Sequence, residues 1–254
     1  MRRLWLSLLL VPVIGVAAPT AAWASPAAPA AKAAPAARSA RAAPATQASA
    51  LQVGSKGASV KALQQRLAAL KYYPGAIDGQ FGTSTLEAVW AFYEVQGLPV
   101  HSYVSKAMNW ALAHPKAPRP LVSRGGANRI EVSLTRHYLV LWRNNQPQLI
   151  SHVSTGGHYY YCSPGGGCGY AVTPTGNFST RVFMRGWVHV PLGEMYNPVF
   201  FISTVFAIHG DTYVPKGPAS HGCVRVPMVV ANVFHNQFKT PGEQVHIYGT
   251  PQYA

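Results

Sequence analysis

Acidic residues are scarce in this sequence. Its 254 residues include 7 Asp and Glu against 21 Lys and Arg, which gives a formal net charge of +14. So few carboxylates argue against a glycosidase, since most of these enzymes need a pair of them at the reacting bond. A strongly basic chain suits a polyanionic partner, and nucleic acid is the first candidate that such a charge raises.

Cysteine is also rare, with only three in the chain. Cys162 and Cys168 flank the glycine-rich segment Ser163 to Gly167. A flexible loop of this kind can close a small disulfide in an oxidising compartment. Cys223 would then remain as the free thiol that a nucleophile requires.

The alternative use of the paired cysteines is a metal site that also draws on two histidines, His152 and His158. Tight zinc-binding spacing such as His-Glu-x-x-His is absent from the sequence. We therefore expect neither a metal nor a cofactor.

Long apolar runs are missing except at the N-terminus, where Leu4 to Ala18 is followed by Ala22-Trp23-Ala24. This pattern predicts a secretory signal peptide over residues 1–24, cleaved after Ala24. The alternative is an uncleaved membrane anchor, but the run is short for a span and is broken by Pro12 and Pro19. We expect a secreted protein of the cell wall or periplasm with no stable membrane anchor. Export argues against nucleic acid and leaves anionic cell-wall polymers as the partner.

Two stretches of low apolar content divide the rest of the chain. Residues 25–50 are almost wholly Ala, Pro, Ser, Lys and Arg, and are expected to be a disordered linker. Residues 116–127, with Pro118 and Pro120, form a second linker. Two domains are therefore expected, at 51–115 and 128–250.

The first domain shows helical periodicity. Val60, Leu63 and Leu67 recur at helical spacing, and turn signals follow around Pro74 and Asp78. Three helices are expected, with N-caps at Ser59, at Ser84 in a capping box with Glu87, and at Ser102.

This domain resembles the peptidoglycan-binding domain found beside many cell-wall enzymes. The residues that carry the resemblance are Gly57, Val60, Leu63-Gln64, Leu67, Gly75, Asp78-Gly79, Phe81-Gly82, Thr85, Ala88-Val89, Phe92 and Gly97-Leu98. The alternative is that its aromatic residues form a core and the domain is only a spacer.

The second domain reads as short strands. Ile130, Val132 and Leu134 alternate, and Asn144-Asn145 marks a hairpin turn. Further strands are expected at 148–155, 177–183, 187–190, 199–203, 205–209 and 243–248. Pro227 is expected to open a helix that runs to about Phe238. The whole chain is thus α+β, with a three-helix module followed by a mainly antiparallel sandwich or open barrel.

The reactive residues cluster in one stretch, His209-Gly210 and then Ser220-His221-Gly222-Cys223-Val224-Arg225. A thiol is a weak nucleophile until an imidazole takes its proton. The intervening loop contains Pro215 and Gly217 and could fold back to bring His209 onto Cys223. Gly222 would clear space for a substrate carbonyl, and backbone N–H groups near it would line an oxyanion hole. The alternative is a buried structural cysteine beside two surface histidines.

This stretch resembles the catalytic signature of the L,D-transpeptidase family, in which His-Gly precedes Ser-His-Gly-Cys, a hydrophobic residue and Asn or Arg. The resemblance covers about residues 128–249. It implies that Cys223 attacks a peptidoglycan stem tetrapeptide and releases its terminal D-alanine. His209 would take the thiol proton, oriented by the Gly210 carbonyl. An amine of a second stem would then resolve the thioester, forming a cross-link in peptidoglycan biosynthesis, with a role in cell shape.

The other signature residues have supporting roles in this hypothesis. Ser220, His221 and Gly222 shape the pocket and its oxyanion hole. Arg225 holds a substrate carboxylate or ties down the loop, since Arg suits both uses. A weaker match at Met195-Tyr196-Asn197-Pro198 makes Tyr196 a substrate-binding candidate.

Two other functions remain open. Water could resolve the thioester, which would make the enzyme an L,D-carboxypeptidase that trims stems, or the catalytic domain could be inert and the protein a wall binder. A papain-like protease is disfavoured because there the cysteine precedes the histidine. The loop that begins at His158-Tyr159-Tyr160-Tyr161 is expected to be a lid whose opening the disulfide limits.

Overall fold

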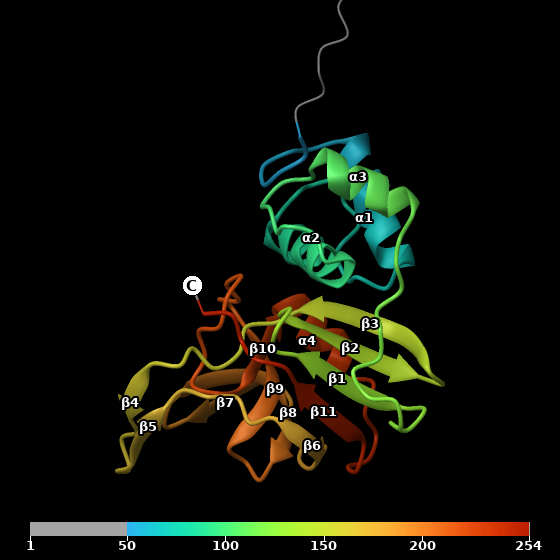
Figure 1. Ribbon diagram of the computed structural model, residues 1–254. Coiled ribbons are helices and arrows are strands. Elements are labelled where there is room, and N and C mark those ends of the chain that lie inside the picture. Colours follow the sequence, from blue (N-terminus) through green and yellow to red (C-terminus); the bar gives the residue numbers. More distant parts are fainter. Residues whose placement is uncertain (1–49, 254) are drawn as a thin grey trace, which may run out of the picture. The chain divides into compact units, whose positions relative to one another are not determined.

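The computed structural model describes residues 50–253 (Figure 1). The predicted signal peptide and all but the last residue of the first predicted linker lie outside the described residues. Residues from Ala48 onward cluster as one compact unit. None of the helices within 50–253 is long and apolar enough to cross a membrane.

The N-terminal module contains the three expected helices, α1 (Ala58–Ala69), α2 (Thr83–Gln96) and α3 (Lys106–Ala113). Their apolar faces form a buried core around Val60, Leu67 and Phe92. Gln64 is also buried and fixes the turn before α2: its amide nitrogen donates to Asp78 Oδ1 at 3.0 Å and its amide oxygen accepts from the Gly79 N–H at 2.8 Å. Residues that carry the family resemblance therefore hold the module together.

The helix caps differ from those expected. Glycines precede α1 and α2, at Gly57 and Gly82, and neither helix has a side-chain cap. Glu87 is buried on α2 instead of returning to the N-terminus of the helix. Ser105, not Ser102, caps α3, and its hydroxyl accepts from the Met108 N–H at 3.1 Å. A side-chain cap therefore sets the start of α3, whereas α1 and α2 begin after glycines at turns.

The second domain is built from two sheets (Figure 1). The first has the order β3-β2-β1-β11-β6, with β1 Arg129–Ser133, β2 Tyr138–Arg143, β3 Gln146–His152, β6 Gly176–Ser179 and β11 Gln244–Tyr248. The second has the order β10-β9-β8-β7, with β7 Trp187–Val190, β8 Gly193–Ile202, β9 Phe206–Asp211 and β10 Val224–Pro227. A separate hairpin pairs β4 (Tyr160–Cys162) with β5 (Cys168–Tyr170).

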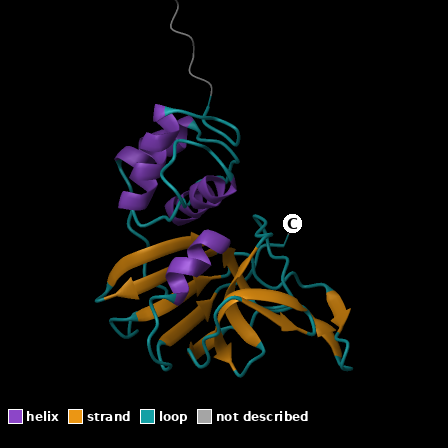
Figure 2. Cartoon of the chain, turned by 180° about the vertical axis from the view of Figure 1, so that it is seen from behind, coloured by secondary structure: helices purple, strands orange, loops and turns teal. Residues whose placement is uncertain are grey.

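One apolar core joins the two sheets. It takes alternate residues of β1 and β2 from the first sheet and residues of β8, β9 and β10 from the second. Helix α4 (Met228–His235) packs on β8, β9 and β10 and adds Val230 and Phe234 to this core (Figure 2). Pairing is antiparallel except for β1 with β11 and β9 with β10. The expected mainly β, largely antiparallel domain is confirmed.

The bounds of several helices and strands differ from those predicted from the sequence. The hairpin turn at Asn144-Asn145 is confirmed, and both residues have positive φ angles, 51° and 59°, as a tight hairpin requires. Pro227 ends β10, and α4 begins at Met228 and ends at His235, short of Phe238. Strand β8 begins at Gly193, well before Val199. Strands β4, β5 and β10 were not predicted.

The module packs against the outer face of the first sheet. Tyr138, Val140 and Trp142 alternate with the inward-facing leucines of β2 and, together with Ile150, join the core of the module. The Ile150 N–H donates to the Lys71 carbonyl at 2.8 Å, so the module also pairs with the edge strand β3. The predicted second linker packs here too, since the Leu121 N–H donates to the buried Glu131 carboxylate at 2.8 Å.

This shared core predicts that removal of residues 1–120 will destabilise the catalytic domain. Large apolar side chains would be exposed at a cost of roughly 1.5–3 kcal/mol each, and the edge strand β3 would lose its cover. We expect a lower melting temperature and self-association, measured by thermal denaturation and size-exclusion chromatography. The matched control is a chain that begins at Ala50. A monodisperse fragment with an unchanged melting temperature would contradict the prediction.

Candidate active site

The signature residues meet because β9 and β10 are parallel neighbours. Val224 pairs with Ile208, and Arg225 pairs with His209. Ile208 and Val224 point into the core between the sheets. Since side chains alternate along a strand, His209 and Arg225 lie on the opposite face, as does Cys223.

That face opens into a cavity of about 410 Å³. His209, Cys223, Asp211 and Arg225 form its floor, with Ser220 and His221 beside them. The walls are the turn between β7 and β8, residues 204–206, and the β4–β5 hairpin, which contributes Tyr161, Ser163, Gly165 and Gly166. A thiol and an imidazole therefore share one enclosed site.

His209 is buried, with 4% of its surface exposed. Its Nδ1 lies 2.9 Å from the carbonyl oxygen of Gly210. A carbonyl only accepts, so Nδ1 carries the proton and Nε2 keeps a free lone pair. Burial lowers the pKa of His209 below its ordinary value, although the Gly210 carbonyl opposes this shift. The ring is therefore a neutral base at neutral pH.

Gly210 is a glycine because α4 lies directly against it. A Cβ at this position would stand 2.7 Å from the Ala231 Cβ and 3.2 Å from the Tyr196 ring. Tyr196 donates its hydroxyl hydrogen to Asn232 of α4 at 2.9 Å. Tyr196 is not among the residues that line the cavity, and it packs beneath Gly210. Its expected contact with substrate stays a prediction.

The Cys223 thiol is partly buried, and burial raises its pKa above the ordinary value. The nearby Arg225 guanidinium opposes this shift. The sulfur lies 3.6 Å from the Val205 carbonyl, to which the thiol donates. Among residues 50–253 it makes no hydrogen bond to His209, so the expected direct pairing is not formed in this arrangement. Thiol and imidazole are both neutral at rest.

A tight turn delivers Cys223 to the cavity. The Ser220 hydroxyl donates to the Cys223 carbonyl at 2.6 Å and accepts from the Gly222 N–H at 3.0 Å. Thr173 donates its hydroxyl hydrogen to the Gly222 carbonyl at 2.8 Å. The Gly222 N–H is therefore occupied, which corrects its expected place in the oxyanion hole. Ser220 acts by fixing the turn.

Gly222 is needed for internal packing at this turn, and its expected role in the approach of a substrate carbonyl stays a prediction. Its φ angle is +141°, which favours glycine. A Cβ here would lie 2.6 Å from the Phe206 ring and 2.7 Å from the Val172 carbonyl oxygen. The turn can close against these two groups only without a side chain.

Arg225 and His221 have distinct surroundings in the cavity. The Arg225 Nε lies 3.1 Å from an oxygen of Asp211, and this ion pair bridges the ends of β9 and β10. The His221 ring meets the rings of Tyr161 and Tyr159 edge-to-face, with centroids 4.7 and 5.4 Å apart. His221 thus connects the turn at Cys223 to the β4–β5 hairpin.

Cys162 and Cys168 form a disulfide that closes the β4–β5 hairpin, and Cys223 is free. The alternative metal site is not assembled from these residues. Disulfide sulfurs cannot act as thiolate ligands, His158 stacks on Tyr170, and His152 is engaged by Glu94 and Pro215.

Sequence reasoning missed three contributors to the site. Asp211 was not among the candidates, although it lies two residues after His209 and so shares its face of the strand. Thr173 was not a candidate either, and its hydroxyl fixes the Gly222 carbonyl. Val205, which accepts the thiol hydrogen, acts through its backbone, and no sequence signal marks such a contact.

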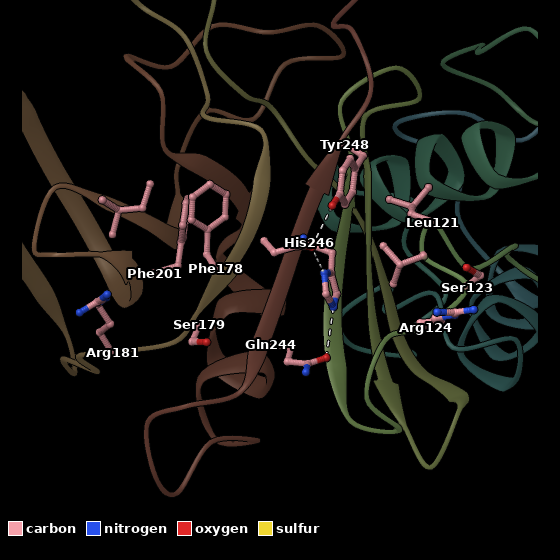
Figure 3. Close-up of a pocket in the computed structure, with 13 residues that line it drawn as sticks. Leu121, Ser123, Arg124, Phe178, Ser179, Arg181, Phe201, Gln244, His246 and Tyr248 are labelled. Atoms are coloured by element: carbon pink, nitrogen blue, oxygen red, sulfur yellow. Dashed lines mark hydrogen bonds between the residues drawn. The ribbon is translucent and has the colours of Figure 1, made fainter.

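A second, larger hollow lies on the outer face of the first sheet. This groove, of about 980 Å³, runs between residues 121–124 and strands β6 and β11. Figure 3 shows Arg181 and Arg124 on opposite sides of the row Gln244, His246 and Tyr248. Within the described part of the chain neither arginine has an ion-pair partner, and the residues that line the groove include no Asp or Glu.

Both domains of the chain are similar to known proteins. Residues 127–247 match the family model of the L,D-transpeptidase catalytic domain, and residues 56–107 match that of a peptidoglycan binding domain. An L,D-transpeptidase structure from Xylanimonas cellulosilytica is 33% identical, with 78% of this chain and 97% of that chain covered and a TM-score of 0.72. No curated protein matches the chain.

Two more distant solved structures are also similar. An L,D-transpeptidase from Stackebrandtia nassauensis is 20% identical, with 79% of this chain and 95% of that chain covered and a TM-score of 0.44. One from Mycobacterium smegmatis is 14% identical, with 48% and 59% covered and a TM-score of 0.39. Neither adds to the assignment.

The family matches and the similarity to the Xylanimonas structure define an enzyme of the acyltransferase type with a peptidoglycan-binding module. The chain belongs to the L,D-transpeptidase family.

The packing around Gly222 predicts that Gly222→Ala will destabilise the turn by roughly 1–3 kcal/mol, through the positive φ angle and the contact with Phe206. The rate of Cys223 labelling should change with it, because this turn holds the thiol in the cavity. Gly217→Ala is the matched control in the same loop, because a Cβ there meets nothing within 4 Å. Thermal denaturation and the rate of thiol labelling measure both effects. Equal behaviour of the two variants would contradict this account of Gly222.

Proposed function

We propose that this protein is a secreted cysteine L,D-transpeptidase that cross-links peptidoglycan stems. The observation that carries the proposal is the orientation of His209. Its Nδ1–H is held on the Gly210 carbonyl at 2.9 Å, which leaves Nε2 as the free nitrogen in the cavity that also contains Cys223. This is the geometry in which an imidazole can receive the proton of a neighbouring thiol.

Catalysis starts from a neutral pair in this mechanism. The thiol turns away from the Val205 carbonyl toward Nε2 of His209 as substrate enters. Cys223 attacks the carbonyl of the third residue of a stem tetrapeptide, and His209 takes the thiol proton. The imidazolium then protonates the leaving amine, so that D-alanine departs and a thioester remains.

In this mechanism, backbone N–H groups of the turn that carries Cys223 stabilise the oxyanion. The Gly222 N–H is taken by Ser220, so the N–H of Cys223 itself is the nearest donor that the reacting carbonyl meets. Arg225 faces the same space and adds positive charge, although its ion pair with Asp211 also fixes the ends of β9 and β10. Both uses of Arg225, on substrate and on the loop, are compatible with this position.

The β4–β5 hairpin is the proposed lid over the thioester. Tyr161 and the glycine-rich tip line the cavity opposite Cys223, and Tyr161 contacts the His221 ring. Covering the thioester excludes water and favours an amine acceptor, so we favour transpeptidation over the carboxypeptidase reaction. An inert wall binder would have no need of a free thiol beside an oriented imidazole.

The mechanism predicts that Cys223→Ala will form no acyl-enzyme with a tetrapeptide donor, measured by intact mass. His209→Ala should reduce the acylation rate by roughly 10²–10⁴, the range for loss of a general base. His221→Ala is the matched control and should cost less, because that ring packs against tyrosines and is not oriented on the Gly210 carbonyl. The reverse order of the two histidine variants would assign the base to His221.

Anionic cell-wall polymers are the proposed second partner, at the groove between residues 121–124 and β6. Arg124 and Arg181 face it without acidic neighbours among the lining residues. Asn177, His246 and Tyr248 form a hydrogen-bonded polar row between them, with the Tyr248 hydroxyl 2.9 Å from Asn177. Two cations beside a polar row suit a phosphodiester backbone.

Sedimentation with purified cell walls tests the groove. The variant Arg124→Ala/Arg181→Ala should bind walls more weakly than wild type, and the difference should shrink at high salt, which screens exposed charges. Arg119→Ala/Lys239→Ala is the control, because it removes the same charge from exposed positions outside the groove. Equal loss in both variants, or the same loss on walls stripped of anionic polymer, would contradict a specific site.

A further inference from the structure

A buried histidine connects the peptidoglycan-binding module to the catalytic loop. His152 is the last residue of β3, and its side chain is 0% exposed. Its Nδ1 lies 2.7 Å from Oε1 of Glu94 on α2, and its Nε2 lies 2.9 Å from the Pro215 carbonyl oxygen. Pro215 belongs to the segment that joins β9, which carries His209, to the turn that carries Cys223.

The chain after His152 serves as a support for that same segment. The Ser154 hydroxyl donates to the Gly217 carbonyl at 2.7 Å. The N–H groups of Ala219 and Ser220 both donate to the Thr155 carbonyl, at 2.8 and 2.9 Å. His152 makes the first contact of this series and is the only one of these supports whose side chain also reaches the module among the described residues.

The two hydrogen bonds of His152 depend on one shared proton. The Pro215 carbonyl only accepts, so Nε2 must carry a hydrogen. A second proton must then lie between Nδ1 and the Glu94 carboxylate, whichever of the two holds it. If that proton is lost, a neutral imidazole has one N–H for two acceptors, and either Glu94 or Pro215 loses its bond.

We infer that His152 is a positioning residue for Cys223, and that Glu94 of the peptidoglycan-binding module holds it in the form that supports the Pro215 carbonyl. The module is thus a working part of the catalytic site as well as an attachment to the wall. This inference rests on the proposed function for its catalytic consequence, but its structural consequence at Cys223 can be measured separately.

Four other titratable groups lie near this pair: Glu87, His137, Tyr72 and Tyr138. Burial raises the pKa of both tyrosines above the ordinary value, so both are neutral near pH 7. Glu87 is buried on the same helix as Glu94. The negative charge of Glu87 favours the protonated form of His152, but the two side chains share no hydrogen bond among the described contacts. His137 belongs to the catalytic domain and lies near His152. Burial lowers the pKa of His137 to about 4, so that its ring is neutral near pH 7. The Trp90 ring meets His152 edge-to-face at 5.3 Å. Among the acidic side chains near His152, Glu94 therefore has the largest effect on the protonation of its ring.

Glu94 variants in the chain beginning at Ala50 test the inference. Glu94→Ala removes the partner of Nδ1, and kcat for acylation by a tetrapeptide donor should fall roughly tenfold with little change in KM, as for loss of one aligning hydrogen bond. Glu94→Gln should rescue it, because the amide can donate to Nδ1 while Nε2–H stays on Pro215. Glu87→Gln, on the same helix and equally buried, should leave kcat unchanged.

The pH profile separates positioning from a general loss of stability. Burial alone would lower the pKa of His152, but the charge and hydrogen bond of Glu94, with the Pro215 carbonyl, outweigh it and raise this pKa above its ordinary value. Wild type therefore keeps the shared proton near neutrality and loses it as pH rises above that raised value. Its kcat should therefore show an alkaline decline. In Glu94→Gln the amide replaces the shared proton, and that decline should disappear. A merely structural role would lower melting temperature in the variants without changing the shape of the profile.

The rate of Cys223 labelling by iodoacetamide serves as a readout that does not require transpeptidase activity. If wild type fails to acylate, the proposed function fails, whereas a labelling rate changed by Glu94→Ala and restored by Glu94→Gln still supports the positioning role. Should Glu94→Ala not fold, the pH profile of Glu94→Gln decides, because its alkaline decline should be lost while its labelling rate near neutral pH stays at the wild-type value. Wild-type values for labelling, kcat and pH profile in both Glu94 variants would overturn the inference.

Discussion

The parallel pairing of β9 with β10 is the constraint on which the site depends. A single register places Ile208 and Val224 in the core and turns His209, Asp211 and Arg225 to the other face. A slip by one residue would bury the imidazole and expose the core side chains. Parallel neighbours need a crossing connection, and here that connection itself carries Cys223 back to the start of β10. Fold and reactive geometry are therefore set by the same hydrogen-bond ladder.

Burial of the side chains beside this ladder determines the charge states of His209 and Cys223 before substrate binds. It lowers the pKa of His209 and raises that of Cys223, so neither group is charged before substrate arrives. A neutral thiol is protected from adventitious oxidation, which attacks thiolates preferentially. In the proposed mechanism, reaction therefore waits for a proton transfer from the thiol to the imidazole. Ser220, Thr173 and the residues after β3 hold the turn on which that transfer would take place.

Sequence patterns gave the order of the domains, the three helices of the module, the tight hairpin at Asn144-Asn145 and the reactive stretch, because each follows from local periodicity or a short motif. They could not give the helix caps, the reason for Gly222 or the position of Tyr196, since these depend on contacts between distant segments. Asp211 was within reach, because period-two alternation from His209 places it on the same face. His152 was not, because its partners lie 58 and 63 residues away in the chain.

The cover that the module gives to Tyr138, Val140 and Trp142 has a consequence for how such proteins diversify. Domains joined only by a linker can be exchanged freely between genes, because neither contributes to the interior of the other. Here β2, in the first sheet of the catalytic domain, presents outward-facing apolar side chains that need a specific neighbour. Replacement of the wall-binding unit would therefore require matching changes along β2 and β3, and the two parts are expected to be inherited together as one piece.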